Sequence, residues 1–113
     1  MGQVQDVTDV WLADGSGEVQ VALPGGAESE LQGAMAGALA GAVQQAVEHL
    51  AIGSVQQIIV EAADGTLLVA TGAQGLTMIV RARHSVNLGL LRLEARKARE
   101  RLAQFRASEV AAG

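Results

Sequence analysis

Apolar and polar residues alternate along two short stretches near the start of the chain. Residues 7–13 are rich in β-forming side chains, and residues 18–23 alternate polar with apolar almost strictly, which is the period-two pattern of a strand with one wet face. Residues 14–17 (Asp-Gly-Ser-Gly) favour a tight turn, because glycine adopts positive φ without strain. This part of the chain therefore predicts a β-hairpin, which ends at the Pro-Gly-Gly of residues 24–26.

A helical pattern follows. Ser29 and Gln32 have the spacing of a capping box, and Gly53 stands where a glycine commonly ends a helix. Apolar residues between them recur at spacings of three and four, which predicts one broad buried stripe. The stripe consists of Leu31, Met35, Ala38, Leu39, Ala42, Val43, Ala46, Val47 and Leu50.

Three further strands and a second helix are predicted after it. Residues 55–62 and 67–71 flank an Ala-Asp-Gly-Thr turn, and residues 76–81 form a fifth strand. The last two strands are apolar on both faces, so we expect them in the middle of a covered sheet. Ser85 or Asn87 caps a final helix from residue 88 to about 107. Its predicted buried stripe is Leu88, Leu91, Ala95, Ala98, Leu102 and Phe105.

Length and composition indicate one domain. The chain has 113 residues, of which 50% are hydrophobic and 18% charged, so it buries a core and is not disordered. We expect a single domain over residues 1–113, with an ordered core over about 5–107 and a short flexible C-terminal tail. The absence of cysteine excludes disulfides and thiolate chemistry and favours a cytoplasmic location. The polar N-terminus is unlike a signal peptide, and residues 31–52 are too polar for a transmembrane span.

The first helix also carries a row of small residues. Gly33, Gly37 and Gly41 recur every four positions, with Ala36 and Ala40 beside them. Each helical glycine costs about 0.5–1 kcal/mol relative to alanine unless packing compensates. One interpretation is a close helix–helix contact with another copy of the chain, since small residues let two backbones approach. The other is that glycine and alanine are simply abundant in the proteome of origin.

The composition of the third predicted strand also favours self-association. It contains no lysine, arginine or proline to protect an exposed edge. Pairing with its symmetry mate in a two-fold dimer would explain this. The alternative is that the strand is covered inside the monomer.

Residues typical of catalysis or metal binding are scarce. His49 and His84 are far apart in sequence and lack a partner at ligand spacing, and there is no phosphate-binding loop. Asp9, Asp14 and Glu18 lack the ligand order of a calcium loop, so a solvated turn is favoured there. We therefore expect no enzyme activity, no cofactor and no metal.

Charge is divided sharply along the chain. All eight basic residues lie at position 81 or later, so residues 1–80 carry −9 and residues 81–113 carry 8 − 3 = +5, giving −4 in total. The net negative charge, the lack of stacking aromatics and the interleaved Glu94 and Glu100 argue against a nucleic-acid surface. A solvated or a protein-facing helix is favoured instead, and the charge division predicts a basic docking surface on that side of the domain.

The second half resembles the Roadblock / dynein-light-chain domain family, in its bacterial or archaeal branch. The residues that carry the resemblance are the apolar strand with a central acid at 55–62, the Asp64-Gly65 turn, the apolar strand 76–80 and the Leu-Gly-Leu-Leu-Arg run at 88–92. The resemblance implies an α+β fold of the profilin-like or longin-like kind. In it, a five-stranded antiparallel sheet of order β-β-α-β-β-β-α lies between helices.

The resemblance also implies self-association. Family members dimerise through the middle helix and the third strand, which matches the two features derived above from the residues. The dimer interface expected here comprises Gly33, Ala36, Gly37, Ala40, Gly41, Gln44, Val55, Gln57, Ile59 and Glu61.

The expected function follows from the same resemblance. Bacterial and archaeal members commonly partner Ras-like small GTPases, so the first hypothesis is a homodimeric domain that regulates or scaffolds such a GTPase. The alternative is a structural assembly subunit without a GTPase partner. The residues expected to dock a partner are Gln45, Glu48, Arg92, Arg96 and Arg99. One departure is that the family usually has a helix before the first strand, and only about six residues precede it here, so the last helix alone would cover one sheet face.

Overall fold

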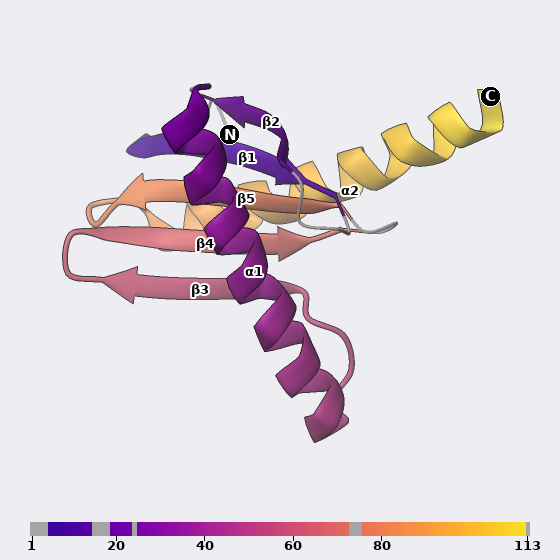
Figure 1. Ribbon diagram of the computed structural model, residues 1–113, viewed down its shortest axis with the longest axis horizontal. Coiled ribbons are helices and arrows are strands. Elements are labelled where there is room, and N and C mark those ends of the chain that lie inside the picture. The colour runs from indigo at the N-terminus through magenta and orange to yellow at the C-terminus, as the bar shows by residue number, and fades with distance from the viewer. Residues whose placement is uncertain (1–4, 15–18, 24, 73–75, 113) are drawn as a thin grey trace.

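The five predicted strands form a single antiparallel sheet of order β2-β1-β5-β4-β3 (Figure 1). The computed structural model describes the backbone of residues 5–14, 19–23, 25–72 and 76–112, and side chains within these ranges up to residue 101, except that of residue 20. The elements are β1 (Val7–Ala13), β2 (Val19–Leu23), α1 (Ala27–Leu50), β3 (Gln57–Ala62), β4 (Gly65–Thr71), β5 (Thr77–Arg83) and α2 (Leu88–Ala112). The predicted α+β fold and order of elements are thus confirmed.

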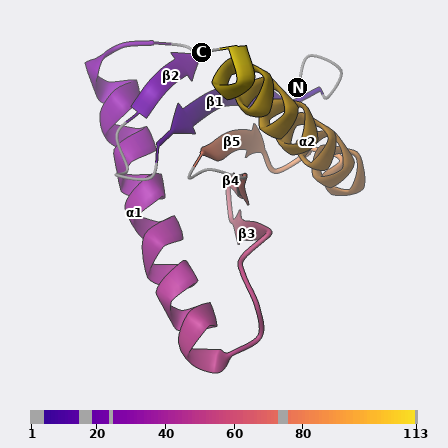
Figure 2. The same ribbon diagram turned by 90° about the vertical axis from the view of Figure 1, so that its right-hand side faces the viewer.

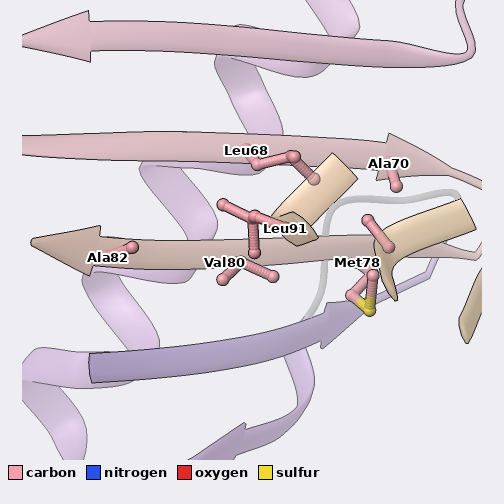
Figure 3. Packing of buried hydrophobic residues seen from close by; sticks show 7 residues of the cluster. Leu68, Ala70, Met78, Val80, Ala82 and Leu91 are labelled. Carbon is pink, nitrogen blue, oxygen red and sulfur yellow. The ribbon is translucent and has the colours of Figure 1, made fainter. Parts of the chain in front are cut away.

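Each face of the sheet carries one helix (Figure 2). On the α2 side, Leu91 and Ala95 are fully buried against β4 and β5, where Leu68 and Val80 are also inaccessible (Figure 3). On the α1 side, Trp11, Val69 and Ile79 pack together with Ala40. Strands β4 and β5 contribute buried residues to both clusters, as their doubly apolar sequences predict.

The face that α1 presents to the sheet is the reverse of the one expected. Gly33 is buried, and a Cβ atom there would lie 2.7 Å from Cδ1 of Trp11. Ala40 is buried as well, whereas Leu31 and Met35 are 61% and 66% exposed. The reason is steric: the indole of Trp11 occupies the space above β1, so the helix crosses it with its small residues. The predicted burial of the large-residue stripe is therefore wrong for these positions.

Several boundaries also differ from the predictions. Helix α1 begins at Ala27, and its N-cap residue is Gly26, which has no side chain that could cap the helix. Ser29, the expected cap, lies within the helix and accepts hydrogen bonds from Nε1 of Trp11 through its carbonyl oxygen (2.7 Å) and its Oγ (3.0 Å). The left-handed residue that ends α1 is Ala51 (φ 55°), before the glycine expected in that role. Of the two candidate caps of α2, Asn87 is the one whose Oδ1 accepts from the amide of Leu90 (3.0 Å).

The strands and the last helix shift by a few residues. Strand β3 begins at Gln57, two residues later than predicted, while β5 continues to Arg83 because Val7 in β1 pairs with Ala82. Helix α2 continues to Ala112, beyond the end expected near residue 107. The predicted contacts of Leu102 and Phe105 lie outside the described side chains.

The close passage of α1 over Trp11 gives a first test. Gly33→Ala places a methyl group against the indole ring and the side chain of Val19, so we expect a loss of about 1–3 kcal/mol in the free energy of unfolding. Gly41→Ala is the matched control, because a Cβ there meets nothing within 4 Å and should add about 0.5–1 kcal/mol through helix propensity. Urea unfolding followed by circular dichroism measures both, and equal stability of the two variants would contradict the packing described.

Candidate interaction surfaces

Helix α1 is longer than the sheet is wide. Its 24 residues span about 36 Å at 1.5 Å per residue, whereas five strands place the outer two about 19 Å apart. The helix begins beside β2, crosses the sheet and runs on past β3 (Figure 1). At this overhanging end Leu50 is 66% exposed, and Ile52, just after the helix, is 71% exposed. The overhang therefore exposes two large apolar side chains and lacks a sheet beneath it in the described part of the chain.

Strand β3 forms the sheet edge next to this overhang. It pairs with β4 alone within the part of the chain that the structure describes, so its outer backbone donors and acceptors are not used by the sheet. Ile58 packs toward the α1 side and Ile59 toward the α2 side, while Val60 is 37% exposed. The prediction of an unprotected apolar edge strand is confirmed.

A shallow apolar groove lies along one flank of α1. Its volume is about 360 Å³. It is lined by Trp11, Gln32, Met35, Ala36, Leu39, Leu67 and Arg81. The large residues of α1 that were expected in the core thus form one wall of an open groove.

The charged residue of this groove, Arg81, is held by a buried acid. Nε of Arg81 lies 2.5 Å from Oδ2 of Asp9, and Cζ of Arg81 lies 5.9 Å from the centroid of the Trp11 ring. Asp9 is 4% exposed and Arg81 is 48% exposed. Burial raises the pKa of Asp9, but hydrogen bonds from Arg81 and Thr8 and the charge of Arg81 outweigh it, so the pKa lies below its ordinary value.

This ion pair predicts a pH-dependent contribution to stability. Because the pKa of Asp9 is lower in the folded state, the pair stabilises fully above the unfolded pKa and loses its effect as pH falls through the folded pKa. We expect Asp9→Asn to lower the free energy of unfolding by about 1–2 kcal/mol at pH 6. The loss is no larger because solvent screens the half-exposed Arg81. The deficit should shrink below about pH 4. Chemical unfolding between pH 6 and pH 3 measures it, with Asp64→Asn in the exposed β3–β4 turn as control; a pH-independent deficit would contradict the assignment.

The residues expected at a dimer interface do not share one surface. Gly33, Ala40 and Val55 are buried within the chain, and Val55 accepts a hydrogen bond from Oγ1 of Thr71. Ala36, Gly37, Gln57 and Ile59 are half-buried, whereas Gly41, Gln44 and Glu61 are exposed. The buried ones serve the chain's own core, which removes them from any free surface. Contact of the others with a second copy stays a prediction.

The residues expected to dock a partner fall on two opposite faces. Gln45 and Glu48 are exposed on α1, and Arg92 and Arg96 are exposed on α2, on the other side of the sheet (Figure 2). Arg99 is half-buried and lines a hollow of about 540 Å³ beside α1, together with Gly37, Gln44 and Thr77. No one partner surface on a single chain contains all five.

The residues considered as metal ligands do not gather into one site in the described ranges. His49 and His84 are both exposed, and no three His, Cys, Asp or Glu side chains in the described ranges come together as metal ligands. Of the three acids considered for a cation, Asp9 is paired with Arg81, and Glu18 lies outside the described residues. No helix in the described part is long and apolar enough to cross a membrane.

The sequence matches the family model of the Roadblock/LC7 domain over residues 1–82. The chain belongs to the Roadblock/LC7 family. The match covers the sheet almost to its last residue together with α1, and ends before α2. No curated protein matches the chain.

Solved structures share the fold of this Roadblock/LC7 domain at low sequence identity. A Roadblock/LC7 domain from Streptomyces avermitilis is 21% identical, with a TM-score of 0.84 over 92% of this chain and 88% of that one. MglB from Myxococcus xanthus is 17% identical, with a TM-score of 0.82 over 90% and 85%. The gliding protein MglB from Thermus thermophilus is 18% identical, with a TM-score of 0.75 over 87% and 76%.

The sheet face beside α2 is only partly covered in this Roadblock/LC7 domain. Leu23 pairs with Val10 and Val21 pairs with Leu12, so the four side chains share the face on which α2 packs. Val21 is 43% exposed and Leu23 is 63% exposed. In the described residues, α2 is the helix that packs on this face.

Two features of the surface were missed by sequence reasoning. The groove beside α1 forms because the small-residue face of the helix packs on Trp11. The spacing of apolar residues along the chain does not determine which face does so. The pairing of Asp9 with Arg81 joins two residues 72 positions apart, and the strand register that aligns them emerges only from the sheet. A weak signal existed, because a charged residue within each of two apolar strands is expected to need a partner.

Proposed function

We propose that this Roadblock/LC7 domain forms a two-fold homodimer that binds a Ras-like small GTPase and regulates or scaffolds it. The observation that carries the proposal is that β3, which pairs with β4 alone in the described residues, forms the sheet edge on the side where α1 overhangs the sheet with exposed apolar residues (Figure 1). Both are costly to leave in water, because the strand edge invites pairing and the overhang exposes large apolar side chains.

A two-fold axis beside β3 would satisfy both features at once. In the proposed dimer, β3 pairs antiparallel with β3 of the second copy, which continues the sheet across the axis. The overhang of each α1 then lies above the other copy's sheet and beside its α1. The contact is isologous, because the same edge and the same helix are used on both sides.

The groove beside α1 offers a seat for the overhang. Its apolar wall of Met35 and Leu39 suits Leu50 or Ile52 of the second copy. Arg81 at the groove suits the carboxyl end of a helix, where the backbone dipole is negative and where Glu48 adds a charge. Fully burying one such apolar side chain contributes about 1.5–3 kcal/mol to the free energy of association, and the two-fold axis gives each dimer two such contacts.

The GTPase partner rests on the family resemblance and on the surface that dimerisation would create. Paired α1 helices would present Gln45 and Glu48 of both copies on one face, above a continuous sheet. The residues described here provide no catalytic group, so the proposed action on a GTPase is through binding and positioning of its own catalytic elements.

The dimer predicts a mass of twice the 11.6 kDa chain in sedimentation equilibrium. Val60→Lys charges the β3 edge and Leu50→Glu charges the overhang, so each should weaken dimerisation by at least about tenfold, or about 1.4 kcal/mol. Leu90→Lys is the matched control for Val60→Lys, since Leu90 is equally exposed (37%) but lies on α2; it should leave the mass unchanged.

Cross-linking tests the arrangement as well as the mass. The chain has no cysteine, so a Met35→Cys/Leu50→Cys double variant should form a covalent dimer under a short bismaleimide only if the overhang sits in the groove. A wild-type chain that sediments as a monomer would overturn the dimer. A dimer in which these two cysteines do not cross-link would overturn the groove seat alone.

The GTPase role has its own measurement. With the Ras-like small GTPases of the source organism, we expect that one of them binds and changes its rate of nucleotide hydrolysis or exchange. Leu50→Glu should abolish the effect if the dimer is the active form. Absence of both binding and a rate change would contradict this role and favour the assembly subunit without a GTPase.

A further inference from the structure

Four residues on the outer side of α2 surround a shallow hollow of about 230 Å³, called here the arginine hollow: Gly89, Arg92, Leu93 and Arg96. Their spacing of 0, 3, 4 and 7 places them on one stripe of the helix. The stripe lies away from Leu91 and Ala95, which are fully buried against the sheet. The arginine hollow thus plays no part in attaching α2 to the sheet.

Three basic residues in the described part of the chain are ion-paired, and the two arginines of the hollow are not among them. Arg81 is paired with Asp9 (2.5 Å), Arg83 with Asp6 (3.5 Å) and Lys97 with Glu94 (3.7 Å). Within the described part of the chain, the guanidinium groups of Arg92 and Arg96 form no ion pair, and both residues are exposed. The hydrogen bond at Arg92 involves its carbonyl oxygen, which accepts from Nε2 of Gln57 (3.3 Å). Two charges are therefore free to meet acids from outside.

The apolar part of the hollow is also unexplained by the fold. Leu93 is 47% exposed between the two arginines. A Cβ at Gly89 would meet only Oδ1 of Asn87, at 3.6 Å, so packing inside the chain does not require glycine there. A helical glycine costs about 0.5–1 kcal/mol relative to alanine. What it provides is room for another backbone to approach the helix closely beside an exposed leucine.

We propose that the arginine hollow binds an acidic amphipathic helix of another protein. Carboxylates of that helix meet Arg92 and Arg96, where charge-assisted and bidentate hydrogen bonds are available. An apolar side chain between them covers Leu93, and Gly89 admits the incoming backbone. The site goes beyond the proposed dimer, because it lies on the sheet face opposite α1 (Figure 2).

Charge favours a short acidic segment over a polyanion. Continuing the same stripe by one turn reaches Glu100, which is exposed, so the positive part is only about two turns long. Residues 1–80 carry −9, and this charge repels a nucleic acid or an anionic membrane that extends beyond the helix. The hollow contains no aromatic residue on which a base could stack. A short helix with a few carboxylates contacts the two arginines without approaching the negatively charged residues 1–80.

A titration of ¹⁵N-labelled protein followed by NMR tests the proposal, since it detects weak binding residue by residue. The probe is a synthetic helical peptide of about 18 residues with leucine flanked by glutamate on one face. We expect amide shifts concentrated at residues 89–96. Arg92→Gln/Arg96→Gln should weaken binding at least tenfold, whereas the charge-matched control Arg83→Gln/Arg101→Gln should not. The same peptide with glutamine in place of glutamate should cause no shifts.

Four outcomes would overturn the proposal. The first is that the acidic peptide leaves residues 89–96 unshifted, and the second is that the two double variants bind it equally. The third is that poly-uridylate or phosphatidylglycerol vesicles bind through the same residues as tightly, which would make the partner a polyanion. The fourth is that Arg92→Gln/Arg96→Gln sediments at a lower mass than the wild-type protein, which would mean that the hollow binds a second copy of the chain. Sedimentation of this variant also separates the hollow from the β3 dimer, because the proposed dimer stays intact in it.

Discussion

The contact between Trp11 and Gly33 determines how the rest of the molecule is arranged. The indole ring lies beneath α1, its Nε1 group donates to Ser29, and the absent side chain of Gly33 leaves room for the ring. Once the helix crosses at this point with its small residues inward, its large residues must face outward. The exposed Met35 and Leu39, the groove that they line and the direction in which α1 leaves the sheet are consequences of this one close packing.

The pattern of the sequence was sufficient for the architecture of the sheet. Strand β1 has the bounds predicted from its composition, and β4 and β5 lie in the interior because both of their faces are apolar. The predicted burial of Leu91 and Ala95 on α2 was also correct. The side chains of the sheet beneath them, such as those of Leu68 and Val80, are smaller than the indole of Trp11, so α2 packs on them with its larger apolar residues. Local periodicity succeeds where one side of an element is clearly more apolar than the other.

The orientation of α1 was not predictable from periodicity. This helix has two apolar faces, one large and one small, and hydrophobicity alone favours the large face as the buried one. The actual choice depends on Trp11, which is 22 residues earlier than Gly33 in the chain and reaches it only in the folded state. For the same reason Ser29 is a partner of the indole rather than a helix cap. The candidate surfaces inherited this error: several residues expected at an interface are buried, and the exposed apolar row is the one expected in the core.

The placement of α1 and α2 on opposite faces of the sheet bears on valency. In a dimer joined at β3, the two α1 helices would lie together on one face, and two arginine hollows would lie on the other, related by the same axis. A partner with two acidic helices on one chain would then bind both hollows, and its affinity would depend on whether its linker spans the distance between them. The domain would in this way select partners by the spacing of their helices as well as by their charge.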